Sequence, residues 1–332
     1  MSETRFDVLG IGNAIVDIIS RCDDALLEEL NLPKGNMQLI DAEQADKLYE
    51  KMGPAIESSG GSAANTIAGL ASFGGKGAFI GKVANDQFGK IFSHDIRSIG
   101  VEFTTPLAEN SSPTAKCMIF VTPDGERTMN TYLGASTELD QGEVDEELIK
   151  TAKVVYLEGY LYDKEEAKAA FHQATEIAAK YGTKVALSLS DAFCVNRHRD
   201  DFRKLVKEGV DILFANEEEI CALYEVESFD EAAALVKAEC QVAALTRGSK
   251  GSVIVTPNET HEVNAHYVSE VVDTTGAGDL YAAGFLFGYA NNQSLVSCGQ
   301  LAGLAAAEII SHLGARPEEN LAELAKKEGL LG

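Results

Sequence analysis

The chain has 332 residues, of which 45% are hydrophobic and 24% are charged, a composition typical of a globular protein with a large buried core. Its 52 acidic residues outnumber its 28 basic residues, which gives a formal net charge of −24 at pH 7. A surface this acidic repels phosphate backbones and anionic lipids, so nucleic-acid binding and membrane-surface binding are disfavoured.

The cysteines and the N-terminal residues predict a cytoplasmic protein. The 6 cysteines form no C-x-x-C pair, and their spacing fits neither a zinc site nor a small disulfide framework. Residues 1–5 contain no apolar signal core, and no apolar run approaches the roughly 18 residues that span a bilayer. We therefore expect reduced cysteines and a cytoplasmic location.

Strands and helices alternate in the first hundred residues. The apolar run 6–12 is rich in β-forming residues and ends in glycine, which predicts a buried strand. Small apolar residues at helical spacing predict a helix over 63–73. The next two segments predict a strand over 78–83 and an amphipathic helix over 87–99.

A β-hairpin interrupts this alternation. The β-like runs 115–122 and 128–133 flank Pro123-Asp124-Gly125, which is a turn signal between strands. The segments 15–20 and 37–40 could add strands to the same small sheet.

The alternation of strand and helix becomes regular from about residue 143. The predicted strands are 154–157, 184–189, 212–215, 242–246 and 252–256, and the predicted helices are 164–181, 202–207, 217–224, 277–289 and 295–312. Such alternation builds a mostly parallel sheet with helices on both faces. Because no long linker or repeat is present, we expect one α/β domain over 1–332 with a small β appendage.

The run D-T-T-G-A-G-D at 273–279 carries the strongest chemical signal. It follows a β-like run at 268–272 and opens a helix of small residues. The small residues Gly276, Ala277 and Gly278 leave backbone N–H groups open at a helix N-terminus, which predicts an anion site. Asp279 would repel an anion, so we interpret it as a base that takes a proton from an attacking hydroxyl. The alternative is a glycine-rich turn that Asp279 merely caps.

Other nucleotide-binding and hydrolase motifs are absent from the sequence. Gly10-Ile11-Gly12 lacks the third glycine of a dinucleotide fingerprint, because residue 15 is isoleucine. No segment matches a Walker A loop, an H-E-x-x-H zinc motif or a G-x-S-x-G elbow.

Five motifs together resemble the ribokinase-like (phosphofructokinase-B) family of small-molecule kinases. Two are the glycine-rich runs: D-T-T-G-A-G-D at 273–279 and S-G-G-S-A-A-N at 59–65. The other three are N-x-x-x-D at 13–17, N-x-x-E at 216–219 and T-x-G-x-x-G at 246–251. Each motif alone is weak, but the five stand in the family's order and cover almost the whole chain.

The resemblance implies an acceptor site and a catalytic base. Asp17 would bind two vicinal hydroxyls of the substrate, and the residues beside it would be Asn13, Gly61, Ser62 and Asn65. Asp279 would accept the proton of the reacting hydroxyl, while the N–H groups of Gly276, Ala277 and Gly278 would stabilise the transferred group.

The resemblance also implies ATP and Mg²⁺ as cofactors. The nucleotide-side residues would be Asn216, Thr246, Gly248 and Gly251, and Glu219 with Asn216 would hold Mg²⁺ through water. The backbone at Asp273 and Thr275 is a candidate half of a K⁺ site. As alternatives, Asn216 could be only a helix N-cap, and Glu219 only an acidic residue favoured in a first turn.

The family fold adds a small β lid to the parallel sheet. We expect a discontinuous lid from about 14–21, 36–40, 102–107 and 114–133. In the nucleoside-kinase branch an arginine placed like Arg127 reaches the transferred phosphoryl group when the lid closes; the alternative is an exposed lid arginine. The lid edge could pair with a second subunit, so monomer and homodimer both stay open.

Three features of the expected acceptor site resemble the adenosine-kinase branch of the family. Where sugar kinases of the family usually carry D-x-N-x-R, the segment 185–193 resembles the L-S-x-x-F of adenosine kinases. Tyr160 stands where adenosine kinases carry a pocket aromatic, and the lid offers Met129, Leu133 and Ala135, which suit a flat purine. Tyr132 and Gly134 depart from the adenosine-kinase pattern.

We therefore expect ATP-dependent phosphorylation of the 5′-hydroxyl of a ribonucleoside, with adenosine first. One alternative is a sugar kinase of the same family, acting on ribose, fructose or a sugar acid. A more distant one is a nucleoside-binding regulator without catalytic activity.

Overall fold

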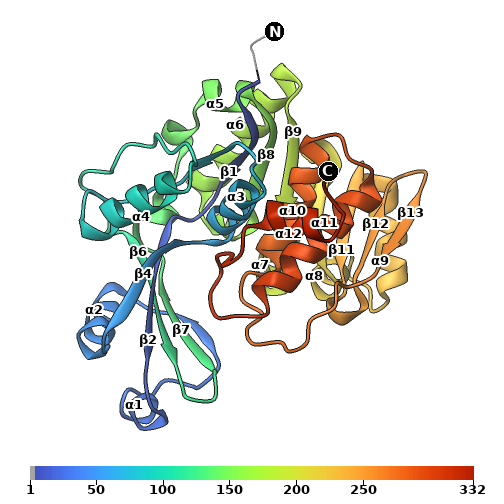
Figure 1. Ribbon diagram of the computed structural model, residues 1–332. Coiled ribbons are helices and arrows are strands. Elements are labelled where there is room, and N and C mark those ends of the chain that lie inside the picture. Colours follow the sequence, from blue (N-terminus) through green and yellow to red (C-terminus); the bar gives the residue numbers. More distant parts are fainter. Residues whose placement is uncertain (1–3) are drawn as a thin grey trace.

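Within residues 4–332, which the computed structural model describes, an eight-stranded sheet forms the centre of the molecule (Figure 1). Its strand order is β13-β12-β11-β10-β9-β8-β1-β5. All neighbouring pairs from β11 to β5 are parallel, whereas β12 and β13 join antiparallel. The bounds are β1 Phe6–Ile11, β5 Gly77–Ile80, β8 Ala152–Glu158, β9 Lys184–Ser188, β10 Ile212–Asn216, β11 Val242–Thr246, β12 Ser252–Val255 and β13 Thr260–Val263. The predicted fold class is confirmed.

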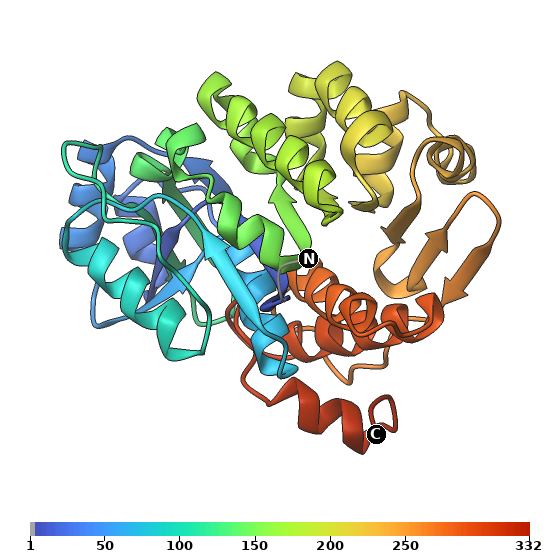
Figure 2. The ribbon, with the colours of Figure 1, turned by 90° about the horizontal axis from the view of Figure 1, so that it is seen from above.

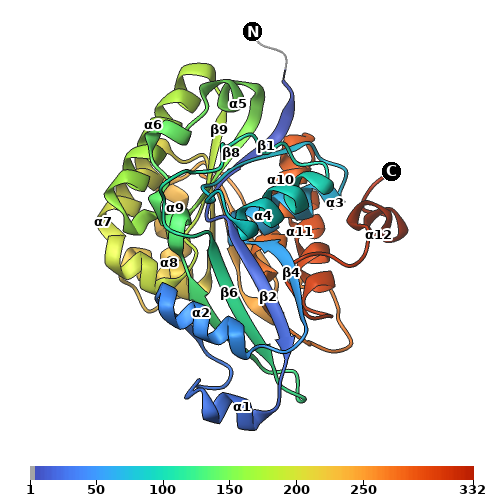
Figure 3. The ribbon, with the colours of Figure 1, turned by 90° about the vertical axis from the view of Figure 1, so that its left-hand side faces the viewer.

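Helices cover both faces of this sheet, as Figures 2 and 3 show. One layer consists of α5 (Glu146–Thr151), α6 (Glu165–Tyr181), α7 (Ala192–Gly209), α8 (Glu217–Tyr224) and α9 (Phe229–Glu239). The other consists of α3 (Ser62–Ser72), α10 (Ala277–Ala290) and α11 (Leu295–Ile309), with α12 (Leu321–Lys327) outside them. Along β8, Val155 and Leu157 pack into the core of the first layer, while Val154 and Tyr156 pack into the core of the second. Burial on both faces explains why such strands are apolar throughout.

A second, five-stranded sheet projects from this body, at the lower left of Figure 1. Its order is β3-β7-β6-β2-β4. The bounds are β2 Ile15–Arg21, β3 Met37–Leu39, β4 Ala55–Gly60, β6 Ala115–Val121 and β7 Arg127–Tyr132. The short helices α1 (Asp24–Glu29) and α2 (Ala42–Lys51) belong to the same part of the chain, and α4 (Gln87–Ser98) contacts β2 and β4. The predicted hairpin is confirmed, since β6 and β7 pair antiparallel across a turn at Gly125.

The lid boundaries need one correction. The segment 102–107 forms no strand of the small sheet; Glu102 instead bridges Ala78 of β5 through backbone hydrogen bonds. The fifth strand is β4, which the sequence did not predict. Its residues, A-I-E-S-S-G, include only one strong strand former, Ile56, and the antiparallel pairing with β2 holds them extended.

Three further boundaries differ from the expectation. The run 268–272 is not a strand, because Val272 lies on the surface and its N–H donates to Ile310 O in the turn after α11. Helix α7 starts at Ala192, where Asp191 caps it, and not at residue 202. Helix α11 ends at Ile309 and does not reach residue 312. Among the helices of residues 4–332, none is both long and apolar enough to cross a bilayer.

Candidate active site

Asp279 lies in the first turn of α10, at the predicted anion loop. Gly276 caps this helix in the left-handed conformation, with φ +79°. Two side chains from the start of α3 donate to the Asp279 carboxylate: Ser62 Oγ to Oδ1 at 2.6 Å and Asn65 Nδ2 to Oδ2 at 3.0 Å. The fold therefore joins the two glycine-rich motifs, which lie more than 200 residues apart in the chain.

The surroundings of Asp279 adjust its proton affinity. Burial raises the pKa of Asp279 above its usual value, while the hydrogen bonds from Ser62 and Asn65 and the charge of Arg316 partly oppose this rise. In the described chain, the N–H groups of Gly276 and Gly278 donate to no protein acceptor, whereas the Ala277 N–H, also predicted to be open, donates to Thr274 O at 3.2 Å. A carboxylate with a raised pKa beside open N–H groups at a helix N-terminus can accept a proton next to a bound anion.

The predicted acceptor residues Asn13, Asp17 and Gly61 also lie close together. Gly61 has φ +100°, and a Cβ there would lie 2.1 Å from Asn13 O, so only glycine fits. A Cβ on Gly60 would lie 2.4 Å from Asp17 Oδ2. Burial raises the pKa of Asp17 to about 6, against the lowering effect of Arg127 and Arg316. The glycine pair thus packs directly against the backbone of Asn13 and the carboxylate of Asp17.

Glu158 is a site residue that the sequence analysis missed. It stands at the carboxyl end of β8 and is 1% exposed. Its carboxylate accepts from Asn13 Nδ2 at 2.6 Å, from Asn13 N at 3.3 Å and from Ala63 N at 2.8 Å. Burial raises the pKa of Glu158 to about 7 despite these donors. An acidic residue directly after a buried strand was the available signal, but E-G-Y at 158–160 was interpreted only for its tyrosine.

Two buried amide oxygens at this site have no protein partner. Asn13 is 2% exposed and Asn65 is 5% exposed, and the Oδ1 of each accepts no hydrogen bond from residues 4–332. Each amide is oriented by a carboxylate that its Nδ2 contacts, Glu158 for Asn13 and Asp279 for Asn65. A buried acceptor without a donor costs free energy, so a ligand hydroxyl that donates to it would bind favourably.

Arg127 links the small sheet to the anion loop. It lies at the start of β7, is 9% exposed, and its Nη1 pairs with Asp273 Oδ2. The same carboxylate accepts from Thr275 N at 2.9 Å and from Gly314 N at 3.2 Å. Burial acts to raise the pKa of Asp273, but the Thr275 N–H and Arg127 bring it below its usual value. The alternative of an exposed lid arginine is wrong. The K⁺ site at the backbone of Asp273 and Thr275 stays a prediction.

Asn216 and Glu219 form a reciprocal cap at the start of α8. Asn216 N and Nδ2 donate to the Glu219 carboxylate at 2.9 and 2.7 Å, and Glu219 N donates to Asn216 Oδ1 at 2.8 Å. The capping role offered as the alternative for Asn216 is therefore present. Burial raises the pKa of Glu219 to about 7.

The side chains of Asn216 and Glu219, at the start of α8, fit Mg²⁺ only through bridging water. No group of three acidic, histidine or cysteine side chains within residues 4–332 could hold a metal ion. The Glu219 carboxylate is tied to Asn216, although carboxylate oxygens can accept further bonds from water. Mg²⁺ commonly keeps several waters and binds one or two carboxylates together with substrate phosphates, which agrees with the water-mediated role expected for Glu219.

The predicted nucleotide-side loop lies next to this cap. Thr246 ends β11 and is the register partner of Asn216 at the carboxyl edge of the sheet, where α/β proteins bind ligands. Gly248 and Gly251 both have positive φ, and a Cβ on Gly251 would lie 2.1 Å from Val263 O. Arg247 Nε pairs with Glu217 Oε2 at 3.1 Å and so fixes the loop to α8.

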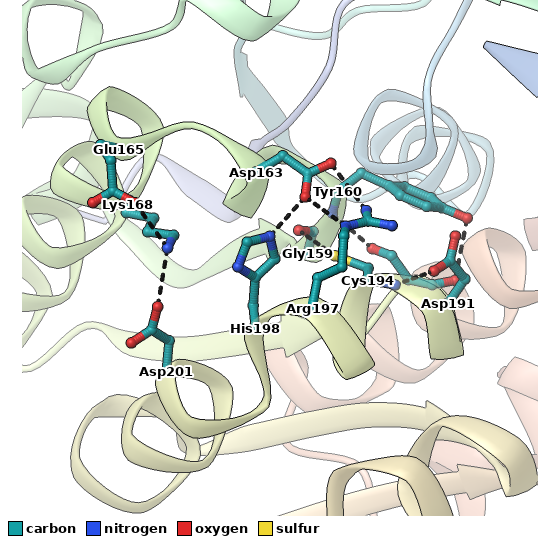
Figure 4. Close-up of polar contacts among 11 residues, drawn as sticks. Gly159, Tyr160, Asp163, Glu165, Lys168, Asp191, Cys194, Arg197, His198 and Asp201 are labelled. Carbon is teal, nitrogen blue, oxygen red and sulfur yellow. Dashed lines mark hydrogen bonds and ion pairs between the residues drawn. The ribbon is translucent and has the colours of Figure 1, made fainter.

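Tyr160 follows β8 in a 3₁₀ turn, Gly159–Asp163, and Figure 4 shows its ring directed toward Asp191. The Tyr160 N–H donates to Ser190 Oγ at 3.1 Å and its hydroxyl to Ser190 O at 3.3 Å. Asp163 anchors the turn to α7, since it accepts two bonds from Arg197, both at 3.0 Å. Tyr160 is 37% exposed, so one part of the ring is open to a ligand.

The apolar lid residues divide into two groups. Met129 packs with Cys117, Ile119 and Leu313 in a small apolar cluster between the lid and the segment after α11. Leu133 lies beyond β7, at the start of a 3₁₀ turn, and is half-buried. Of the three lid residues expected to face a purine, only Met129 therefore belongs to this apolar cluster. The expectation for Ala135 is wrong, because its side chain is fully buried in the protein.

Comparisons with known proteins identify the family. The profile of the pfkB family carbohydrate kinases matches residues 36–321. The solved adenosine kinase from Sinorhizobium meliloti is 53% identical, with a TM-score of 0.90 over 98% of this chain and 100% of that chain. A solved probable sugar kinase from Rhizobium etli CFN 42 is 52% identical, with a TM-score of 0.91 over 99% and 100%.

A more distant curated relative agrees. The probable fructokinase-6, chloroplastic, of Arabidopsis thaliana is 31% identical over 245 residues, and the match covers 71% of this chain. This chain spans 64% of that relative, just under two thirds of its length. With a family match over most of its residues and both glycine-rich motifs meeting at Asp279, the chain belongs to the pfkB family of carbohydrate kinases, enzymes that transfer a phosphoryl group from ATP to a hydroxyl group.

Proposed function

We propose that this kinase phosphorylates the 5′-hydroxyl of a ribonucleoside, with adenosine as the preferred acceptor and MgATP as the donor. The observation that carries the proposal is the Asp279 carboxylate, held by Ser62 and Asn65 beside two buried amide oxygens that lack donors. Ribose offers vicinal hydroxyls for Asp17 and for the free oxygens of Asn13 and Asn65, and the 5′-hydroxyl then faces Asp279.

The transfer step follows from this arrangement. Asp279 takes the proton of the 5′-hydroxyl while the oxygen of that hydroxyl forms a bond to the γ-phosphorus of ATP. The bond from this phosphorus to the oxygen that bridges to the β-phosphate breaks, which releases ADP. The N–H groups of Gly276 and Gly278 face the charge on the transferred group, where preorganised donors stabilise a transition state most effectively. Glu219 would hold Mg²⁺ through water, and the ion would supply neutralisation of the charge on the ATP phosphates.

Arg127 of the small sheet would also act on the transferred phosphoryl group. Its guanidinium is already at the anion loop through Asp273, so a small displacement toward bound phosphate would add a second cation to the γ-phosphoryl group. Closure of the lid over the acceptor would exclude water and limit hydrolysis of ATP.

The aromatic and apolar side chains support a base-bearing acceptor. The partly exposed ring of Tyr160 and the apolar surface of Met129 can contact a purine. Met129 offers a sugar hydroxyl no strong hydrogen bond, and the hydroxyl proton of Tyr160 is already donated to Ser190 O. Sequence similarity does not favour one acceptor, because the adenosine kinase and the probable sugar kinase are 53% and 52% identical to this chain. A sugar kinase is therefore the second candidate.

The test is ADP release with ATP, Mg²⁺ and a panel of adenosine, inosine, guanosine, cytidine, ribose and fructose, with Asp279→Asn as the blank. We expect turnover with adenosine at the lowest KM. Turnover with ribose or fructose alone would overturn the nucleoside assignment but keep the roles of Asp279 and Asp17. No ADP release above the blank with any acceptor would overturn the proposed function.

A further inference from the structure

Arg316 reaches the active site from the segment that follows α11. Its guanidinium makes three hydrogen bonds to the strand-to-helix turn between β4 and α3: Nε to Ser59 O at 3.0 Å, Nη2 to Ser59 Oγ at 2.9 Å and Nη1 to Ala64 O at 3.1 Å. The two carbonyls stand on either side of residues 60–63, so one side chain spans the whole glycine-rich turn.

This turn has little local support of its own. Gly61 is the N-cap of α3 and supplies no side-chain hydrogen bond to the helix. Consecutive glycines at 60 and 61 also lose more backbone freedom on folding than other residues would, which disfavours the ordered turn. The turn nevertheless has to present Ser62 and Asn65 to the Asp279 carboxylate.

Asp95 of α4 holds the same turn from the opposite side. Its Oδ2 accepts from Ser59 N at 2.7 Å and from Ser59 Oγ at 2.5 Å. The Ser59 hydroxyl therefore donates to Asp95 and accepts from Arg316, which makes a continuous chain of hydrogen bonds from α4 to the segment after α11. Ser59 is 1% exposed, so these bonds have little competition from water.

The charge of Arg316 is balanced by nearby carboxylates. Burial lowers the pKa of Arg316 to about 10, while Asp95, Asp17 and Asp279 favour its charged form, so the guanidinium stays cationic at neutral pH. Arg127 is the other cation that affects Asp17. A fixed positive charge near Asp17 and Asp279 favours their ionised forms.

We propose that Arg316 is a positioning residue for phosphoryl transfer, which clamps the 59–64 turn so that Ser62 and Asn65 hold the Asp279 carboxylate in line with the acceptor hydroxyl. The inference rests on the proposed function, because it assigns Arg316 to the base that this function uses. Lysine cannot replace the clamp, since an ammonium group lacks the planar, multi-donor geometry that reaches three acceptors at once.

The experiment compares Arg316→Lys and Arg316→Gln with the control Arg97→Lys. Arg97 donates from Nε and Nη2 to one backbone carbonyl, Phe103 O, and makes no contact with the turn. We expect kcat to fall about 10²-fold in both Arg316 variants, as for a catalytic group displaced by about 1 Å, with a smaller change in KM for ATP. Arg97→Lys should keep the wild-type kcat.

The pH profile separates orientation from charge. Loss of the positive charge in Arg316→Gln should move the acid limb of kcat/KM to higher pH, whereas Arg316→Lys should retain the wild-type limb and still have the low kcat. A wild-type kcat in Arg316→Gln would overturn the proposal. An equal loss in Arg97→Lys would also overturn it, because the effect would then be one of general stability.

Amide hydrogen exchange provides a readout that does not need turnover. Peptides that cover 59–65 should exchange faster in Arg316→Gln than in the wild type or Arg97→Lys. If the wild type phosphorylates no acceptor, the proposed function fails while exchange still decides whether the clamp exists. If Arg316→Gln does not fold, Ser59→Ala removes the hydroxyl that accepts from Arg316 and donates to Asp95, and an unchanged kcat and unchanged exchange in that variant would contradict the proposal.

Discussion

At the scale of single residues, Asp279 is defined by the two donors that orient it. Ser62 Oγ and Asn65 Nδ2 each occupy one carboxylate oxygen, and both donors belong to the turn that also meets Asn13. A carboxylate used only as a helix cap would need neither donor. The geometry thus gives the loop aspartate a fixed direction, which a proton acceptor requires.

Replacing this carboxylate tests its role as a base. Asp279→Asn keeps the size of the side chain but cannot take a proton, so we expect kcat to fall by about 10²- to 10⁴-fold. Acceptor affinity, measured by calorimetry, should change little. Asp145→Asn is the control, because Asp145 caps α5 away from the site and asparagine caps equally well. A kcat near the wild-type value in Asp279→Asn would exclude the assignment.

The raised pKa of Asp279 predicts the acid limb of activity. The base works only when ionised, and burial shifts its pKa above the ordinary value of 3.8. The kcat/KM for the acceptor should therefore decline on acidification at a pH above 3.8, and protonation of Asp17, whose pKa burial raises to about 6, should contribute to the same decline. A limb at or below 3.8 would show that the base is not a buried carboxyl.

Glu158 predicts a loss of acceptor binding that is separate from chemistry. Glu158→Gln leaves one oxygen to accept from Asn13 Nδ2, Asn13 N and Ala63 N, so at least one buried donor loses its partner at a cost of about 1–3 kcal/mol. If Asn13 then turns away from the acceptor, affinity falls about 10- to 100-fold. Calorimetric titration of the acceptor measures this change, with Glu146→Gln at an exposed ion pair as control.

At the scale of elements, the turn between β4 and α3 is the critical joint. It connects the small sheet to the helix layer, and it carries Gly61 against Asn13 of the segment after β1. Arg127 makes a second connection between β7 and the anion loop. Movement of the small sheet would therefore displace both the acceptor residues near Asn13 and the anion loop.

Gly61→Ala should break this joint. The variant must adopt φ +100°, which costs about 1–3 kcal/mol, and its Cβ would also meet Asn13 O. We expect a lower urea midpoint together with loss of acceptor binding. Gly182→Ala is the matched control, since Gly182 also has positive φ, +76°, but has open space around it. An acceptor affinity unchanged in Gly61→Ala would contradict the close contact between Gly61 and Asn13.

At the scale of the whole molecule, two kinds of negative charge oppose folding as pH rises. The net charge of −24 produces repulsion across the surface. In the interior, burial raises the pKa of Asp17 to about 6, of Glu158 to about 7 and of Glu219 to about 7. The folded state binds protons at these groups that the unfolded state has already released.

The ligand-free protein should accordingly lose stability between about pH 4.5 and pH 7, since stability falls with pH where the native state binds more protons. Urea unfolding across this range measures the effect. Salt separates the two causes, because added NaCl screens surface repulsion but acts much less on buried carboxyls. A stability that rises steadily to pH 7 at high salt would contradict the raised pKa values.

The same unfolding measurements test the predicted K⁺ site. A stabilisation by KCl beyond that by NaCl would support a K⁺ site at Asp273 and Thr275.

The sequence alone was enough to predict the fold class and most of the site. Apolar strands buried on both faces, regular helices and the turn at Gly125 are local patterns, and so is the anion loop that carries Asp279. Asn13, Asp17, Ser62 and Asn65 were expected only from the resemblance of their motifs to a kinase family. The structure brings these candidate residues together.

Only the tertiary structure decided the remaining features. Strand β4 and the bridge at Glu102 depend on which neighbour a weakly β-forming segment meets, and propensity does not contain that information. Glu158 and Arg316 lie outside the recognised motifs, and their importance comes from donors and carbonyls contributed by distant segments. Periodicity along the chain reports burial and local geometry, whereas hydrogen bonds between residues more than a hundred positions apart are set by chain packing alone.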